Sequence, residues 1–189
     1  MVLSGGGATR LDGADKARLE HDGRTLLEHA LGAVVAASEV VVVGPAVPTS
    51  RPVTFTRETP PGGGPLAGVS AGVAALTGRP DLVVVLAVDM PHVTADTVAR
   101  LLHAADDNDH DGAWLVDDTG RRQLAGAVRP ALVPSPGDAD GVPMRVLMHH
   151  DRTVDVVSLG HEADDVDTWA DVDRLRPGRI DPAPRVDRT

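Results

Sequence analysis

The sequence lacks cysteine and tyrosine altogether, and its 189 residues include only one phenylalanine and two tryptophans. Without cysteine there can be no disulfide, no thiolate metal site and no cysteine nucleophile. With so few aromatic rings, the chain has no row of stacking platforms for single-stranded nucleic acid. The core must therefore be built from valine, leucine and alanine.

Positive charge is also scarce: 18 lysines and arginines stand against 28 aspartates and glutamates, which gives a formal net charge of −10. An acidic surface argues against nucleic acid or an anionic membrane as a partner, although it allows a small cationic pocket. No apolar run is long enough for a membrane span, and no signal peptide is recognisable. We expect a soluble cytoplasmic protein, a monomer or weak homo-oligomer, whose length suggests one domain.

Strand-like and helix-like segments alternate from residue 2 to residue 105. The first is a two-residue stub so near Met1 that we expect the natural start codon to lie upstream. Further strands are predicted at 40–43, 53–56 and 82–88, and helices at 26–37, 66–77 and 95–105. This alternation predicts right-handed βαβ crossovers and a parallel sheet, which is an α/β fold.

The second half of the chain is less regular. We expect strands near 113–116, 124–128 and 153–157, and helices near 143–150 and 168–175. No internal repeat and no linker divides the chain, so one domain is expected over residues 1–176. Residues 177–189, which hold three prolines and scattered charges, are expected to form a disordered tail.

Lys16 is the only lysine among the 18 lysines and arginines, and it stands shortly after the glycine-rich stretch Ser4-Gly5-Gly6-Gly7. Successive backbone N–H groups with two nearby cations, Arg10 and Lys16, form a cradle for a polyanion such as a phosphate chain. The stretch lacks the dinucleotide and P-loop spacings, and a tight turn with a solvated lysine is the alternative. The uniqueness of Lys16 favours the phosphate role.

Asp89 directly follows the most apolar strand, at the carboxyl edge where open α/β sheets bind ligands. A carboxylate there can hold Mg²⁺, which prefers one or two carboxylates together with phosphate oxygens. The alternative is a turn or capping aspartate, but Thr94 is the better cap for the next helix. Asp167, in an acidic run before the last helix, is equally consistent with a second metal ligand and with a helix cap.

Other polar patterns carry less information. Arg121, Arg122 and Gln123 precede a strand and are candidates to contact an anionic second substrate, although a solvated hairpin turn explains them as well. Residues 107–112 match the first half of a calcium loop, but a strand follows where that loop requires a helix. The eight histidines show no metal-binding spacing, and adjacent His149 and His150 are expected on the surface.

Several motifs resemble those of a known family, the molybdenum cofactor guanylyltransferases of the wider nucleoside triphosphate transferase superfamily. The resemblance begins with its L-[AS]-G-G…R-[ML]-G…D-K signature, matched by Leu3-Ser4-Gly5-Gly6, Arg10-Leu11 and Asp15-Lys16. It continues in the same order through Gly64-Pro65-Leu66-Ala67-Gly68, Asp89-Met90-Pro91 and Asp165-Val166-Asp167-Thr168. Order and spacing agree over roughly residues 2–175.

The resemblance implies a Rossmann-like, three-layer α/β/α fold with a mostly parallel central sheet. It also implies Mg²⁺-dependent transfer of GMP from GTP to molybdopterin, with release of pyrophosphate. Carried over by position, the residues that meet the nucleotide are Leu3, Ser4, Gly5, Gly6, Lys16 and Asp89. Asp89 would also bind the metal, with Asp167 as its partner, and Lys16, Arg10 and Asp89 would be the catalytic residues.

The chain departs from the family pattern at several positions. Gly44 stands where some members have a nucleotide-contacting Asn, and Glu58 or Thr59 where others have an Asp, which makes Glu58 a nucleotide-binding candidate. Asp167 replaces an Asn, and Trp169 replaces a Pro. These changes concern base selectivity more than phosphate chemistry.

Alternative functions remain open at this point. They are cytidylyl transfer to molybdopterin, nucleotidyl transfer to a sugar phosphate or phospholactate, and a nucleotide-binding protein without turnover. If the protein transfers GMP to molybdopterin, Arg122 and Gln123 are expected to contact this phosphate-bearing acceptor. A redox Rossmann protein is disfavoured because the dinucleotide fingerprint is missing.

Overall fold

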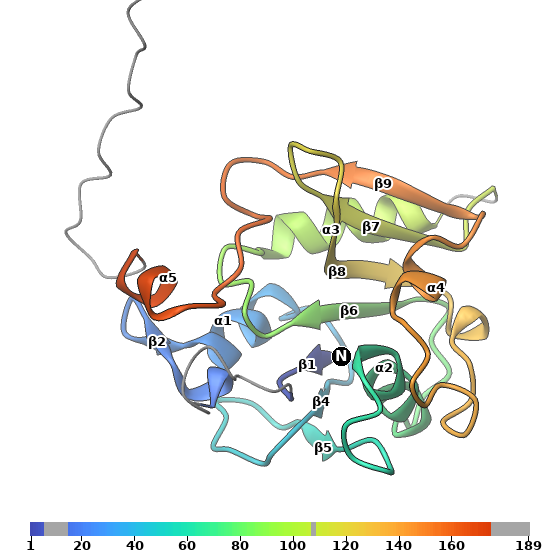
Figure 1. Cartoon of the computed structure of the whole chain (residues 1–189), viewed down its shortest axis with the longest axis horizontal. Helices are drawn as coiled ribbons and strands as arrows, with labels where there is room; N and C mark the ends of the chain where they lie inside the picture. The colour runs from blue at the N-terminus through green and yellow to red at the C-terminus, as the bar shows by residue number, and fades with distance from the viewer. Residues whose placement is uncertain (6–14, 107–108, 175–189) are drawn as a thin grey trace, which may run out of the picture.

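The computed structural model of the protein describes residues 1–5, 15–106 and 109–174. Its centre is a seven-stranded sheet covered by helices on both faces (Figure 1). The strand order is β5 (Thr54–Thr56), β4 (Val41–Val43), β1 (Val2–Leu3), β6 (Val83–Ala87), β8 (Arg122–Val128), β7 (Gly112–Val116) and β9 (Thr153–Val157). Strand β8 alone runs antiparallel to its two neighbours, β6 and β7.

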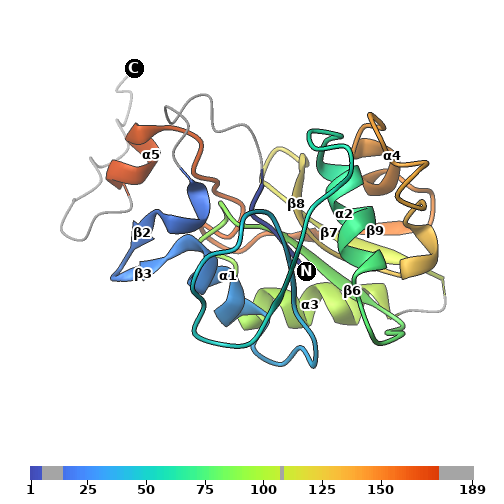
Figure 2. The same cartoon turned by 90° about the horizontal axis from the view of Figure 1, so that it is seen from below.

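Helices form the two outer layers of the sheet. They are α1 (Leu26–Ala33), α2 (Pro65–Ala74), α3 (Ala95–Ala105) and the short α4 (Arg145–Met148), whereas α5 (Trp169–Arg174) lies at one edge of the sheet. Figure 2 shows α1 and α3 on one side of the sheet and α2 and α4 on the other. The two 3₁₀ turns η2 (Lys16–Arg18) and η3 (Pro130–Leu132) and a hairpin of β2 (Glu20–His21) and β3 (Arg24–Thr25) complete the described structure.

Two apolar cores fill the spaces between these layers. Because side chains alternate along a strand, Val2 and Leu86 pack with α1 and α3, whereas Leu3 and Val85 pack with α2. The central strands β4 and β6 are valine-rich and largely buried, as expected for a sheet covered on both faces, whereas the edge strands β5 and β9 are partly exposed. The fully buried Trp114 on β7 lies against Gly126 of β8, where any Cβ atom would overlap its indole ring.

Local sequence explains where the main helices begin. The Thr25 side chain accepts a hydrogen bond from the Glu28 amide at the start of α1. Thr94 and Thr97 form a reciprocal capping box at the start of α3, as short hydroxyl side chains do at helix N-termini. Pro65 occupies the first turn of α2, where its missing N–H costs nothing.

The predicted α/β/α architecture with a mostly parallel sheet is confirmed. Some predicted bounds were wrong: α1 ends at Ala33 rather than at residue 37, and α4 has four residues. The predicted strand at 113–116 is present as β7, which rules out a calcium loop running into a helix there. The predicted tail at 177–189 lies outside the described residues. In the part of the chain that is described, no helix is long and apolar enough to cross a bilayer.

Candidate active site at the carboxyl edge of the sheet

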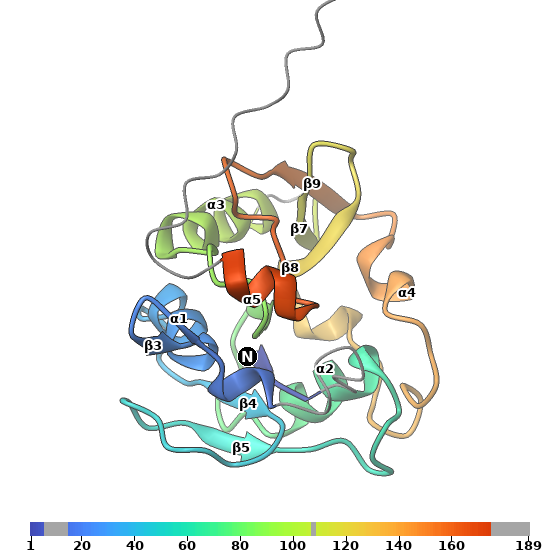
Figure 3. The same ribbon diagram turned by 60° about the vertical axis from the view of Figure 1, so that its left-hand side comes forward.

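The site lies where β1 and β6, the two central parallel strands, end side by side. Leu3 pairs with Ala87 in this ladder, and the Val88 amide donates to the Leu3 carbonyl over 2.9 Å. The chain therefore leaves β1 toward the glycine-rich stretch at the same edge at which Asp89 follows β6. Figure 3 looks onto this edge, with α5 in front of the strands.

Lys16 joins three distant parts of the chain at this edge. Its Nζ donates to Oδ2 of Asp89 and to Oδ1 of Asp167, both over 2.7 Å. The Asp15 carboxylate accepts from the Ala17 amide and so caps η2, the turn that carries Lys16. The side chains of Lys16 and Asp89 are only 17% and 22% exposed, so this cluster is shielded from full solvation.

The segment carrying Asp167 is held by its own hydrogen bonds. The Val166 amide donates to the Asp89 carbonyl over 2.9 Å, which fixes this segment against the end of β6. The amides of Asp167 and Thr168 both donate to Oδ2 of Asp171 in α5. Because Oγ1 of Thr168 in turn accepts from the Asp171 amide, Thr168 and Asp171 together cap the start of this helix, and the Asp167 carboxylate reaches Lys16 instead.

The charges in this cluster stabilise one another. Burial alone would lower the pKa of Lys16, but the hydrogen bonds and charges of Asp167 and Asp89 outweigh it, and the pKa is raised above 10.5. The nearby carboxyl of Asp165 has a raised pKa because of desolvation and the negative charges of Asp167 and Asp89. Negative charge thus exceeds positive charge here, a setting that favours a bound cation.

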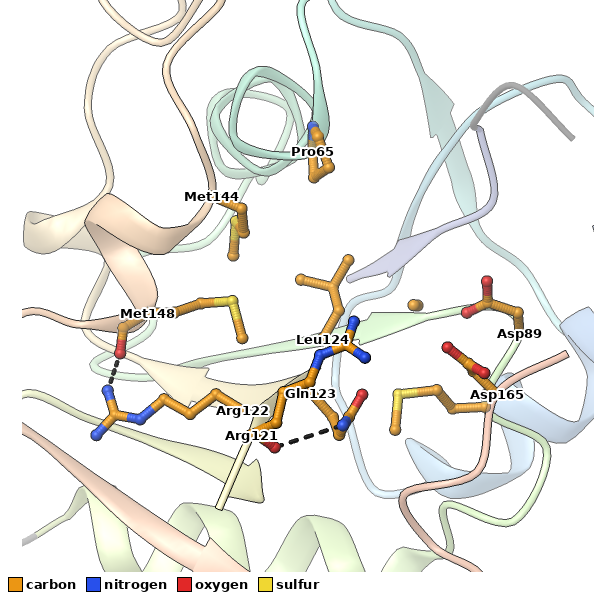
Figure 4. A pocket seen from close by; sticks show the side chains of 11 residues that line it. Pro65, Asp89, Arg121, Arg122, Gln123, Leu124, Met144, Met148 and Asp165 are labelled. Carbon is orange, nitrogen blue, oxygen red and sulfur yellow. Dashed lines mark hydrogen bonds between the residues drawn. The ribbon is translucent and has the colours of Figure 1, made fainter. Parts of the chain in front are cut away.

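A cavity of about 250 Å³, which we call the strand-edge cavity, opens beside Asp89. Figure 4 shows it bordered by Pro65 at the start of α2, by Met144 and Met148, and by Asp89 and Asp165 on the opposite side. The Arg121 guanidinium points into this space from the start of β8. A phosphate-bearing ligand in the cavity would meet Arg121 on one side and the Lys16 cluster on the other.

Arg122, the predicted acceptor-binding arginine, points away from Arg121. Its Nε lies 2.5 Å from Oδ1 of Asp155, and its Nη1 donates to the Met148 carbonyl and to Oγ1 of Thr153. The side chain therefore ties β8 to α4 and β9. Gln123, the second predicted acceptor residue, lines the strand-edge cavity and donates to Oδ2 of Asp117 over 2.9 Å.

The predicted nucleotide-binding residues are only partly described. The amides of Ser4 and Gly5 both donate to the Val43 carbonyl, so neither points freely at a ligand in this state. Leu3 is buried in β1, and Gly6 and Arg10 lie outside the described residues. Glu58 follows β5, where its Oε1 accepts from the Gly62 amide.

The donor set at this edge suits a hard cation. Asp89 and Asp167 both touch the same ammonium, so their oxygens lie no further apart than the sum of two hydrogen-bond lengths. Two carboxylates with phosphate oxygens are what Mg²⁺ prefers. Among the described residues, no group of three or more His, Asp or Glu is arranged to hold a metal by itself.

The sequence singled out Arg121, Arg122 and Gln123 together, and all three line the strand-edge cavity. It treated Asp165, which also lines this cavity, only as part of an acidic run. Arg121 directly precedes β8 and Arg122 is its first residue, so the alternation of side chains along the strand does not tell which guanidinium reaches into the cavity. That depends on the contacts of Arg122 with α4 and β9, which the local sequence does not reveal.

Comparisons with known proteins identify the family to which the chain belongs. Residues 1–153 match the family of MobA-like NTP transferase domains. In sequence, the chain is 40% identical over 111 residues to the molybdenum cofactor guanylyltransferase of Acidiphilium cryptum (strain JF-5), a match that covers 53% of this chain and 55% of that protein. The chain thus spans just over half the length of this curated relative.

Solved structures show the same fold. The chain is similar to the molybdopterin-guanine dinucleotide biosynthesis protein A of Archaeoglobus fulgidus, with a TM-score of 0.72 and 20% identity over 92% of this chain and 94% of that one. It is also similar to Rv0371c of Mycobacterium tuberculosis in complex with manganese, with a TM-score of 0.69 and 18% identity over 92% and 95% of the two chains. Because the family match covers well over half of the sequence, the chain belongs to the family of MobA-like NTP transferase domains.

Proposed function

We propose that the protein is a nucleotidyltransferase that transfers GMP from GTP to molybdopterin in the cytoplasm and releases pyrophosphate. The observation that carries the proposal is the position of Lys16, whose ammonium lies between Asp89 and Asp167 at the carboxyl edge of the sheet. The choice of GTP and molybdopterin is supported by the family and by the activity for which the curated relative is named.

In the proposed reaction, a phosphate oxygen of the acceptor attacks the α-phosphorus of GTP in line. The new bond joins that oxygen to the α-phosphorus, and the bond to the bridging oxygen of the β-phosphate breaks. Pyrophosphate then leaves with the electron pair of the broken bond. No covalent enzyme intermediate is needed, so the protein contributes positioning and charge neutralisation.

Lys16 is suited to neutralise the leaving pyrophosphate. Its raised pKa keeps the ammonium charged at neutral pH, and its flexible stem allows it to turn from the carboxylates to phosphate oxygens. Arg10, outside the described residues, stays a predicted second cation. Arg121 faces the strand-edge cavity and is placed to hold the phosphate of the acceptor.

The carboxylates of Asp89 and Asp167 fit Mg²⁺ by their chemistry and closeness. When bound, Mg²⁺ supplies positive charge for the α-phosphate and the attacking oxygen. Asp89 would bind it from a rigid strand end, whereas Asp167 would reach it from the segment before α5. Turning Lys16 away would remove its ammonium from both carboxylates.

The donor can be identified by ligand-induced stabilisation. A thermal-shift series with GTP, CTP, ATP and UTP, each with and without Mg²⁺, is expected to show selective stabilisation by GTP with Mg²⁺, because only a ligand of the native state raises the unfolding temperature. Pyrophosphate release should require both GTP and molybdopterin. Selective stabilisation by another triphosphate, or no release with GTP and acceptor, would refute the proposal.

A further inference from the structure

A second cavity, about 500 Å³ in volume, adjoins the strand-edge cavity. We call it the histidine cavity, because His21, His92 and His161 line it together with Arg121 and Gln123. Arg121, Gln123 and Asp165 line both cavities, so the two spaces share a wall. The volume of the histidine cavity is within the range of roughly 300–1,000 Å³ that is typical of small-molecule sites.

The histidine rings come from separate elements and form one continuous row. The ring centroids of His21 and His92 are 5.6 Å apart, and those of His92 and His161 are 5.8 Å apart. Behind them, His29 packs on His21 at 5.1 Å, and its Nε2 lies 2.8 Å from the His21 carbonyl. These spacings are those of packed aromatic rings. The planes of His21 and His92 are 76° apart and those of His92 and His161 are 50° apart, so the row offers both ring faces and ring edges to a ligand in the cavity.

The row does not carry the charge that an anion site would need. Burial, followed by the neighbouring charge of His21, lowers the pKa of His92 below 6.5, although Asp164 opposes this shift. The cavity is also lined by Asp117, Asp164, Asp165 and Asp171. Arg121 is the only arginine or lysine among the described residues that line it. An anionic group would therefore be held only at the end where Arg121 stands.

A metal ion is also disfavoured as the occupant. Within the described residues, no group of three or more histidine and carboxylate side chains is arranged to hold one. Oδ2 of Asp164 lies 2.8 Å from Nδ1 of His161, so this pair is already engaged. The remaining chemistry is that of flat rings beside carboxylate acceptors, which suits a planar heterocycle with N–H donors on its edge.

The strand order places this cavity on the acceptor side of the site. Apart from Asp89, the residues that match nucleotide-binding positions lie in or follow β1 and β5, whereas His92 follows β6 and Arg121 directly precedes β8. In the sheet order β5-β4-β1-β6-β8-β7-β9, most of the lining of the histidine cavity therefore comes from segments that follow β6, β7 and β9 or precede β8, and only His21 of β2 comes from the β1 side. A ligand whose phosphate met Arg121 would extend its body over the histidine row.

From this arrangement we infer that the histidine cavity binds the nitrogen-rich heterocycle of the acceptor, with the ring stacked on His92 and its N–H edge donating to the carboxyl group of Asp165, which lines both cavities. This inference rests on the proposed function for the identity of the acceptor. It adds a recognition site for the acceptor ring, formed by side chains of this chain that no local motif brings together.

The test uses a soluble fluorescent pterin, 6-hydroxymethylpterin, titrated into the intact protein. We expect saturable quenching that weakens at least tenfold in His92→Ala, because about that much is lost with one stacked base. His92→Phe should retain most of the binding, since it keeps a flat ring. His149→Ala, which alters an exposed histidine elsewhere, is the matched control. If His92→Ala does not fold, the titration is repeated with His161→Ala, which alters an exposed member of the histidine row.

Other probes decide the class of ligand. If guanosine competes as well as the pterin, the cavity takes the donor base and the inference fails. If ribose 5-phosphate binds in a His92-dependent manner and the pterin does not, the cavity takes a sugar phosphate and the inference also fails. Absence of saturable pterin binding to the wild-type protein would overturn it as well.

Kinetics separate this inference from the proposed function. With GTP and molybdopterin, His92→Ala should raise the KM for the acceptor at least tenfold and leave the thermal shift by Mg²⁺ and GTP unchanged. If the KM for the acceptor is unchanged in His92→Ala, the inference about the histidine cavity is wrong, but the proposed transferase function is unaffected. If the pterin binds in a His92-dependent manner and no pyrophosphate is released, the proposed transferase function is wrong, but the inference that the cavity binds a pterin-like ring is unaffected.

Discussion

The Nζ atom of Lys16 lies 2.7 Å from Oδ2 of Asp89, a residue 73 positions further along the chain. The same ammonium reaches Asp167, which is 151 positions away. The chain's only lysine is thus the point at which the glycine-rich start, the end of β6 and the C-terminal segment meet. Its ammonium contacts both carboxylates of the proposed metal site, so under the proposed function the binding of a phosphate and of a metal would be coupled through Lys16.

Replacing Lys16 should abolish turnover without unfolding the protein. We expect Lys16→Ala to lower kcat/KM by roughly a thousandfold, because it removes a charge that neutralises the leaving pyrophosphate. Lys16→Arg should be nearly as poor, since a planar guanidinium does not replace a compact ammonium between two carboxylates. Pyrophosphate release measures the rates, and circular dichroism checks the fold. Near-normal rates in a folded Lys16→Ala protein would rule out this role.

The same substitution should have the opposite effect on metal binding. Without the ammonium, Asp89 and Asp167 lose their competing partner, so Lys16→Ala should bind Mn²⁺ in the absence of nucleotide roughly tenfold more tightly than the wild type. Asp89→Asn should bind it more weakly. Titration calorimetry with Mn²⁺ gives both affinities. Weaker Mn²⁺ binding in Lys16→Ala would show that these carboxylates do not form the metal site.

The local sequence predicted the positions of the strands well, but it did not predict the direction in which each strand runs. The valine runs at β4 and β6 identified buried strands because burial on both faces leaves an all-apolar pattern. Nothing in Arg122–Val128 indicated that β8 runs antiparallel, because direction depends on which strands it joins. The β2–β3 hairpin was missed although its turn holds Asp22 and Gly23, both with positive φ, and an Asp-Gly pair is a recognised hairpin signal.

Single residues of the site were predicted more readily than their groupings. Lys16 and Asp89 were identifiable because one is unique and the other ends an apolar strand. The row of His21, His92 and His161 was not, since its members belong to three elements with no common spacing. Spatial clusters of this kind depend on loop paths, which local propensities do not determine.

Substitutions of Arg121 and Arg122 should have different effects, the first on acceptor binding and the second on the stability of the fold. Arg121→Ala is expected to raise the acceptor KM at least tenfold with little change in unfolding free energy, because its guanidinium faces the strand-edge cavity and supplies a charge-assisted contact to phosphate. Arg122→Ala should destabilise the fold by about 1–3 kcal/mol, since it removes the ion pair with Asp155 and the hydrogen bonds to the Met148 carbonyl and Thr153. Urea unfolding and acceptor kinetics on both variants measure the two effects. The reverse pattern would show that Arg122 is the ligand-binding residue.

Glu162 should make part of the stability depend on pH. This buried carboxylate accepts from Oγ1 of Thr97 over 2.6 Å and from the Leu159 amide over 2.7 Å, and it pairs with Arg100. Burial alone would raise its pKa, but these hydrogen bonds and the charge of Arg100 outweigh it and lower the pKa below 4.5.

Because the folded-state pKa of Glu162 is lowered, its stabilisation is fully present above pH 4.5 and is lost as the pH falls through the folded value. Glu162→Gln should lower the unfolding free energy by about 1–3 kcal/mol at pH 7, and the gap from the wild type should narrow below pH 4.5. Urea unfolding at pH 7, 5, 4 and 3 measures both curves. A constant gap down to pH 3 would show that Glu162 titrates alike in the folded and unfolded states, and that its carboxylate does not anchor the segment before α5 to α3.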